Sequence, residues 1–191
     1  GRNFAGTETK TYNITAKPVT ITAASESFNY DGEAHSNNSV SANVCGLVTG
    51  HVLTATATGS VRNVADNSTG NNPIATGYTI KSGDEDVTSN YAIRATAGTL
   101  TINAVAFDVA DITNTVYNGE AQAKAPVVTY GNKTLVAGTD YEVAYSKDVT
   151  NAGTVTVTVT VKGNYTGTVE KTYQITTKPV TITAASESFK R

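Results

Sequence analysis

The sequence predicts an all-β protein made of tandem β-sandwich modules, arranged end to end in an elongated chain. Three observations predict it: a nearly literal internal repeat, runs in which apolar residues alternate with Thr, and turn-forming residues at short intervals. Of the 191 residues 39% are hydrophobic and only 16% are charged, and Thr, Gly, Asn and Ser supply much of the rest. This composition favours strands and turns over helices or disorder.

The internal repeat sets the expected domain boundaries. The segment KTYNITAKPVTITAASESF at 10–28 recurs at 171–189 as KTYQITTKPVTITAASESF, with two differences. A weaker repeat, YDGEA and YNGEA, begins at Tyr30 and again at Tyr117. We therefore expect a closing strand of a preceding module at 1–16, module A at 17–104, module B at 105–177, and the opening strand of a following module at 178–191.

The strands are predicted from period-two alternation of apolar and hydroxyl side chains. The alternation covers Pro18–Thr22, Thr99–Ile102 and the long run Thr154–Val161. In each run Val, Ile or Leu would face a core and Thr would face solvent. Short strands between turns spaced 8 to 12 residues apart indicate sandwiches rather than a single barrel, and leave the strand order open.

Turns and module junctions are predicted from Gly, Asn and Pro. Asp31-Gly32, Asn118-Gly119 and Gly131-Asn132 predict tight turns, because Gly and Asn tolerate a positive φ. Lys17-Pro18 and Lys178-Pro179 lie at the expected junctions, where Pro favours a short, nearly extended connection with little swing.

Charge and cysteine usage exclude several classes of function. The net charge is −2 and the Lys and Arg residues are scattered, which argues against nucleic acid as a partner. No apolar run approaches the roughly 20 residues of a membrane-spanning helix, so we expect no direct membrane insertion. Cys45 is the only cysteine, which excludes an intramolecular disulfide and leaves open whether its thiol is free.

Two ordered sets of motifs carry a resemblance to a known family. The first set is YDGEAH (30–35), GLVTGH (46–51), DVTSNY (86–91) and GTLTI (98–102), and the second is VYNGEA (116–121), GTDYEVAY (138–145), NAGT (151–154) and GNYTGT (163–168). Together they resemble the MBG-type and related bacterial immunoglobulin-like repeats of large Gram-positive surface proteins. The resemblance implies immunoglobulin-like sandwiches in a secreted stalk or adhesin on the bacterial cell surface, anchored to the cell wall elsewhere in the full protein.

Candidate catalytic and metal sites are weak. Cys45 and His51 lie in one Gly-containing region, but no helix N-terminus or cationic setting that would activate the thiol is evident, so we predict no catalytic residue and no enzyme. The run Asp84, Glu85 and Asp86 offers the oxygen ligands that Ca²⁺ favours. One loop rarely supplies six or more ligands, so the alternative is a solvated turn, and no cofactor is expected.

Two further sets of side chains are candidates for binding. Asp31, Glu33 and His35 would share one face of a strand and present a metal constellation, against the alternative of a solvated turn. Tyr141 and Tyr145 would likewise share a strand face, on which a sugar could stack. The alternative for these two residues is a cross-strand aromatic support for the sheet.

Three functions from different classes remain open. The favoured one is a structural spacer that displays a distal domain, at roughly 30 to 40 Å per module for strands rising about 3.3 Å per residue. The second is a direct binding module for host mucin, glycans or matrix protein, and the third is an accessory domain of a larger carbohydrate-active enzyme. Expected partners are neighbouring modules of the same chain, and strand-swapped self-association is a further hypothesis, because identical elements exchange at little cost. A Lys–Asn isopeptide cross-link, which needs a buried acid, is left open.

Overall fold

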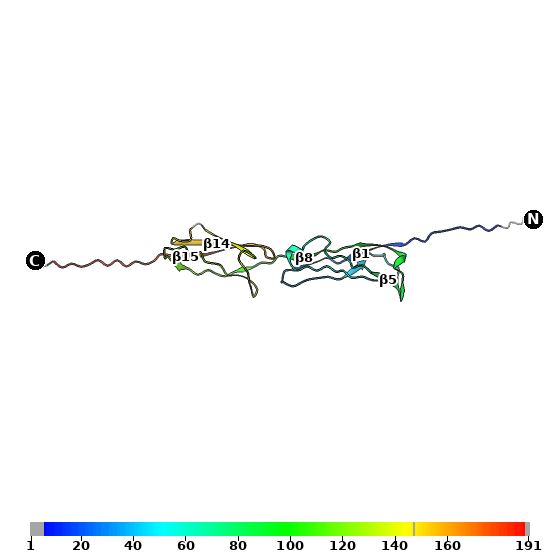
Figure 1. The fold of residues 1–191 in the computed structure, drawn as a ribbon, viewed down its shortest axis with the longest axis horizontal. Coiled ribbons are helices and arrows are strands. Elements are labelled where there is room, and N and C mark those ends of the chain that lie inside the picture. The colour runs from blue at the N-terminus through cyan, green and yellow to red at the C-terminus, as the bar shows by residue number, and fades with distance from the viewer. Residues whose placement is uncertain (1–5, 147, 190–191) are drawn as a thin grey trace, which may run out of the picture. The chain divides into compact units, whose positions relative to one another are not determined.

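A computed structural model describes residues 6–146 and 148–189 of the protein. The chain divides into two compact units, and it passes from unit 1 to unit 2 between Asn103 and Ala104 (Figure 1). The described residues form strands, turns and two 3₁₀ turns, which confirms the all-β class. Each unit is described separately below.

Unit 1 consists of three small sheets with strand orders β3-β1-β7, β2-β8 and β4-β5-β6. Strand β1 is central in its sheet, antiparallel to β3 and parallel to β7, and β2 is parallel to β8. The elements are β1 (Lys17–Ala23), β2 (Glu26–Asn29), β3 (Val40–Ala42), β4 (His51–Thr54), η1 (Val64–Asp66), β5 (Thr79–Ser82), β6 (Glu85–Asp86), η2 (Thr88–Asn90), β7 (Tyr91–Thr96) and β8 (Leu100–Asn103).

The core of unit 1 follows from the alternation along β1. Val19 and Ile21 are buried, while the Thr residues beside them are half-buried or exposed, as the sequence predicts. Val19 and Ile21 pack with Ile80 of β5, with Tyr91 of β7, and with Val87, which lies between β6 and η2. Because these residues come from separate sheets, one apolar cluster joins the sheet of β1 to the sheet of β5.

Unit 2 contains a four-stranded sheet with order β10-β15-β14-β13 and a three-stranded sheet with order β12-β11-β9. Its strands are β9 (Asp108–Val109), β10 (Thr115–Val116), β11 (Val128–Tyr130), β12 (Lys133–Thr134), β13 (Tyr141–Tyr145), β14 (Gly153–Val161) and β15 (Thr168–Thr176). In β14 every second residue from Val155 to Val161 is buried, and Tyr173 and Ile175 of β15 are buried as well. The predicted long Val/Thr run is therefore a central strand with one core-facing side.

The predicted turns are formed. Gly32, Gly119 and Gly131 have φ angles of 87°, 86° and 54°, in the left-handed region where a side chain is disfavoured. Cys45 is the one non-glycine among the described residues with a positive φ, at 60°.

A buried asparagine connects separate parts of unit 1. Asn72 is 0% exposed. Its side-chain amide donates to the carbonyl oxygens of Ala24 (2.9 Å) and Asn37 (2.8 Å) and accepts from the backbone N–H of Gly59 (2.8 Å). Its backbone pairs with that of Gly98, where an added Cβ would overlap the carbonyl of Ala24. Asn72 therefore links four separate backbone segments of unit 1 by hydrogen bonds.

Two more asparagines cover one edge of β8. The side chain of Asn71 donates to the carbonyl oxygen of Leu100 (2.9 Å) and accepts from its N–H (2.7 Å), and Asn67 makes the same pair of bonds with Ile102 (2.9 and 2.7 Å). Since β2 occupies the other edge of β8, both edges are hydrogen-bonded at these residues. Side-chain amides here protect an edge that would otherwise be free to pair.

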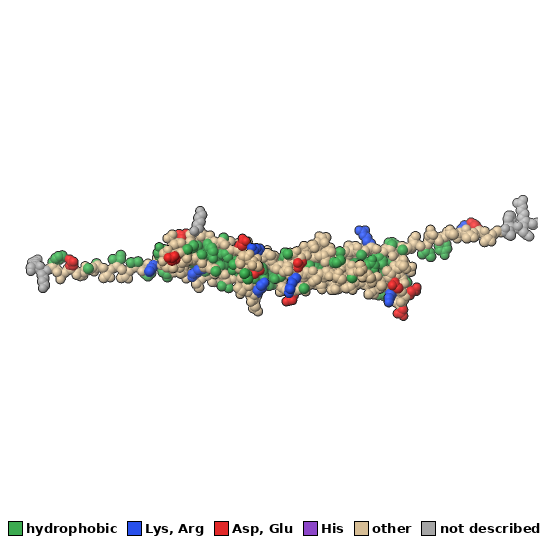
Figure 2. Space-filling view, in the orientation of Figure 1, with side chains coloured by type: hydrophobic (Ala, Val, Ile, Leu, Met, Phe, Trp, Pro, Cys, Tyr) green, Lys and Arg blue, Asp and Glu red, His purple; other side chains and the backbone are tan. Residues whose placement is uncertain are grey.

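The described parts of the two terminal segments, 6–16 and 178–189, form no strand. Their side chains are exposed, including Tyr12, Ile14, Val180 and Ile182. Figure 2 shows hydrophobic side chains along both terminal segments. That these segments belong to neighbouring modules remains a prediction. The first five and last two residues assigned to those strands lie outside the described residues.

Candidate functional site

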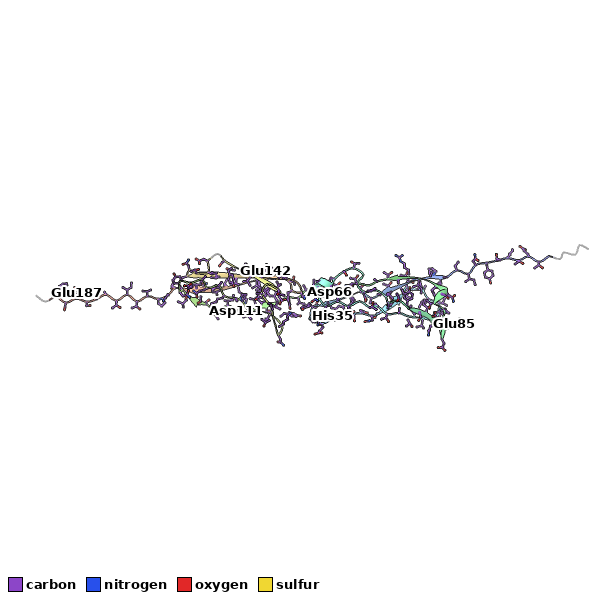
Figure 3. The ribbon with its side chains drawn as sticks, viewed as in Figure 1. His35, Asp66, Glu85, Asp111, Glu142 and Glu187 are labelled. Carbon is purple, nitrogen blue, oxygen red and sulfur yellow. The ribbon has the colours of Figure 1, made fainter. Side chains whose placement is uncertain are left out.

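The three consecutive carboxylates proposed as a calcium site do not converge. Asp84 lies in the turn after β5, and Glu85 and Asp86 form the short strand β6. Figure 3 labels Glu85 at this hairpin. Consecutive strand residues point to opposite faces, and Asp86 accepts hydrogen bonds from the N–H (2.9 Å) and hydroxyl (2.5 Å) of Thr88. These bonds lower the pKa of Asp86, the hydroxyl contributing most. The Asp86 carboxylate thus stabilises the turn that leads into η2.

The second metal candidate is also a turn and not the strand face that the alternation predicts. The Asp31 carboxylate accepts the N–H of Glu33 (2.8 Å) and lies 3.0 Å from Nε2 of His35. The Glu33 N–H lowers the pKa of Asp31 most, followed by the His35 hydrogen bond. The His35 ring stacks on Phe28, with centroids 4.5 Å apart. Across the described chain, no three His, Cys, Asp or Glu side chains are grouped to hold a metal.

The proposed tyrosine platform is mostly internal. Tyr141 is 5% exposed, so its ring has no free face for a sugar. Tyr145 is half-buried and its hydroxyl donates to the carbonyl oxygen of Lys124 (2.9 Å). Burial raises the pKa of Tyr145. The burial of Tyr141 argues against sugar stacking on its ring and favours the alternative in which both rings support the sheet.

Cys45 and His51 have separate surroundings. Cys45 is an exposed free thiol in the turn after β3. His51 begins β4, and its Nδ1 lies 2.6 Å from the hydroxyl of Tyr91, which also accepts the N–H of Val48 at 3.0 Å. His51 therefore belongs to a structural contact between β4 and β7. No acidic side chain in the described residues is buried, so the buried acid required for an isopeptide cross-link is not found there.

A pocket of about 430 Å³, here called the junction pocket, lies at the end of β15. It is mostly apolar and is lined by Tyr117, Asn151, Ala152, Thr177, Lys178 and Val180. The first three residues belong to the folded part of unit 2, and the last three belong to the extended segment that leaves β15. Sequence reasoning identified Tyr117 only as part of a turn repeat and did not identify this pocket.

A smaller pocket of about 160 Å³ lies where the chain enters unit 1. It is lined by Ile14, Thr15 and Ala16 of the extended segment and by Ser89 and Asn90 of η2. By the sequence repeat, 14–16 correspond to 175–177. The two pockets therefore involve copies of the same connecting segment, one seen against the end of unit 2 and the other against the start of unit 1.

No helix among the described residues is long and apolar enough to cross a membrane. Comparisons with models of protein families, with curated proteins and with solved structures give no match for the chain.

Proposed function

We propose that the chain is a spacer segment of an extracellular bacterial surface protein, made of tandem immunoglobulin-like β-sandwich modules that hold a distal domain away from the cell. The observation that carries this proposal is that the same sequences occur once inside a core and once exposed. Ile21 is 0% exposed in β1, whereas its copy Ile182 is 90% exposed. Tyr173 is 1% exposed in β15, whereas its copy Tyr12 is 85% exposed.

These exposed copies support a repeating array because exposed apolar strands are costly in isolation. A strand with alternating Val, Ile and Thr gains stability only when its apolar side packs against a core. The segment 178–189 has the sequence of 17–28, which pairs with β3, β7 and β8 in unit 1. A further copy of unit 1 after unit 2 would give 178–189 the same partners. In an array, each exposed terminal segment would pair with an adjacent copy in this way.

The strand pairing supports a mechanical role. In unit 1, Lys17–Thr22 runs parallel to Tyr91–Thr96, and Glu26–Asn29 runs parallel to Leu100–Asn103. The first strands of the unit are thus paired side by side with its last strands. A pull on the two ends of the unit would slide these strands past each other, so that the ladder hydrogen bonds resist together instead of opening one at a time. Unit 2 has a shorter parallel ladder between β10 and β15. The N–H of Tyr117 extends this ladder by donating to the carbonyl oxygen of Thr176.

Unit 2 supports the sandwich part of the proposal. It contains one four-stranded and one three-stranded sheet, and both contribute buried side chains, such as Val157 from β14 and Val128 from β11. Two sheets that each bury one face are the elements of a β-sandwich.

A length measurement on tandem copies tests the spacer proposal. Chains with one, two and three copies, joined through the shared 178–189 segment, are compared by small-angle X-ray scattering. A spacer predicts a maximum dimension that grows in proportion to the number of copies, by about 30 to 40 Å per module for strands along the axis. Compact particles, whose dimension grows much more slowly, would overturn it.

A second candidate, direct binding to mucin, glycans or matrix protein, is favoured by the apolar junction pocket with its exposed Tyr117. The test is saturable binding of the intact chain to immobilised mucins, glycans and matrix proteins. The matched control is Tyr117→Ala, because this ring lines the pocket without being buried in the core. Binding that Tyr117→Ala removes would favour the binding module over the spacer.

A further inference from the structure

We propose that the junction pocket of unit 2 is the seat for a second copy of unit 1, and that the loop of residues 44–48, here called the Val44 loop, fills it. This inference rests on the proposed array and specifies its contact surface. It predicts a packed junction of fixed geometry where unit 2 is followed by another copy of unit 1.

The Val44 loop lies beside the start of β1. Gly46 is so close to Val19 that an added Cβ would be 2.7 Å from the Val19 Cγ2 atom. Val48 donates its N–H to the hydroxyl of Tyr91, and Tyr91 is the partner of Lys17 in the parallel ladder. The loop therefore lies against Val19 of β1 directly and is connected to Lys17 through Tyr91.

By the sequence repeat, we expect the same arrangement of loop and strand at the junction pocket. Lys178 and Val180 are the copies of Lys17 and Val19, and both line the pocket. When a second copy of unit 1 folds on the segment 178–189, its Gly46 must approach Val180 as Gly46 approaches Val19. The second Val44 loop is then placed at the pocket, opposite Tyr117 and Ala152.

The two surfaces match in chemistry. The side chains of Val44 and Val48 are exposed in unit 1, Val44 almost completely. The pocket is mostly apolar, and the Tyr117 ring is partly exposed. Contact would remove apolar surface from water on both sides, which is favourable by about 25 cal/mol per Å². No charged side chain of the pocket other than Lys178 faces the seat, and Lys178 belongs to the connecting segment itself.

The smaller pocket gives independent support. In unit 1 the η2 residues Ser89 and Asn90 lie against 14–16. In the array 175–177 take the place of 14–16, and 177 also lines the junction pocket. The connecting segment is therefore enclosed by unit 2 on one side and by η2 of the following copy on the other. A segment held on both sides has little freedom to bend.

The test uses a tandem chain in which residues 1–189 are followed directly by residues 29–191 of a second copy, which keeps the repeat in register. In the first copy Cys45→Ser removes one thiol and Ala152→Cys places another in the pocket, so the second-copy Cys45 is its one potential partner. The matched control is Thr139→Cys, an exposed residue beside the opposite end of the sheet, where Tyr141 pairs with Val161. Mild oxidation is followed by mass spectrometry.

We expect the Ala152→Cys chain to form its intramolecular disulfide at least about tenfold faster than the Thr139→Cys chain, because contact raises the effective concentration of the two thiols. A second readout needs no cysteine and combines Tyr117→Ala in the first copy with Val48→Ala in the second. The effects of the two substitutions on the unfolding equilibrium constant should be non-additive by more than about twofold. Equal cross-linking rates together with additive effects would overturn the proposal.

Hydrogen exchange separates failure of this junction from failure of the array. If amides of 178–189 exchange as fast in the tandem chain as in the single chain, these residues do not form β1 and β2 of a following copy, and the proposed array fails. If they become protected while cross-linking and coupling are absent, the array stands and the packed junction is wrong. Protection with cross-linking and coupling supports both.

Discussion

The buried Asn72 gives the most demanding test of how unit 1 is held together. Asn72→Ala removes three hydrogen bonds, to the carbonyls of Ala24 and Asn37 and from the N–H of Gly59. At about 1 kcal/mol each, they contribute about 3 kcal/mol. Gly59 is buried, so its N–H would also lose its partner without access to water, which costs roughly a further 1 to 3 kcal/mol. We expect a loss of about 4 to 6 kcal/mol, a large part of the 5 to 15 kcal/mol typical of a domain.

This loss is measured by urea unfolding of the full chain, monitored by hydrogen exchange of the backbone amides. Amides of unit 1 and unit 2 report the unfolding transition of each unit separately. The transition of unit 1 should move to lower urea concentration while unit 2 keeps its midpoint. Asn132→Ala is the matched control, since Asn132 is exposed in a turn of unit 2, and surface changes usually stay within about 0.5 kcal/mol. A loss in unit 1 below about 1 kcal/mol would refute the view that Asn72 holds these segments together.

The remaining predictions concern packing, backbone space and pH. Ile21→Ala should destabilise unit 1 by about 2 to 5 kcal/mol, whereas the same change at its exposed copy Ile182 should have no measurable effect in the single chain; equal effects in thermal unfolding would contradict the assignment of core and exposed copies. Gly98→Ala should lower the melting temperature of unit 1, because its Cβ would overlap a backbone carbonyl, while Gly6→Ala, with open space around it, should not. The pKa of Asp31 is lowered from 3.8 in the folded state, so its contribution to stability is complete above about pH 4 and is lost as the pH falls through the lowered pKa. The melting temperature should therefore fall as the pH drops below about 4, with a smaller fall in Asp31→Asn; an identical acid response in that variant would show that Asp31 is not involved.

Much of the all-β architecture could be predicted because alternation acts locally. The Val/Thr run of β14 and the opening run of β1 determine which side chains face inward, whatever their partners are. The turns at Gly32 and Gly119 follow in the same way, since only the local backbone demands a positive φ.

Pairing and side-chain burial could not be predicted in this way. The alternation of Asp31, Glu33 and His35 reads as a strand, but the Asp31 carboxylate captures the backbone N–H of Glu33 and forms a turn. Tyr141 and Tyr145 both belong to β13, but alternation does not predict which face of the strand is covered. In the structure, Tyr141 is buried in the core.

The asparagine contacts and the junction pocket depend on residues far apart in sequence. Asn72 contacts Ala24, 48 positions away, and no local pattern marks it. The pocket combines Tyr117, Ala152 and Val180, which only the folded unit brings together. The repeat gave the one available signal, because it identified Val180 as a copy of a core residue.

In the proposed array two unlike units alternate, and this has a consequence for folding during synthesis. Adjacent modules with the same sequence can pair strands with each other and become trapped in a misassembled state. Here the nearly literal repeat returns only after a complete second unit, so the closest copy of β1 along the chain lies beyond β15. Each unit emerging from the ribosome would have a neighbour with different strands. In the proposed array, this spacing of the repeat would reduce the exchange of copied strands between adjacent units.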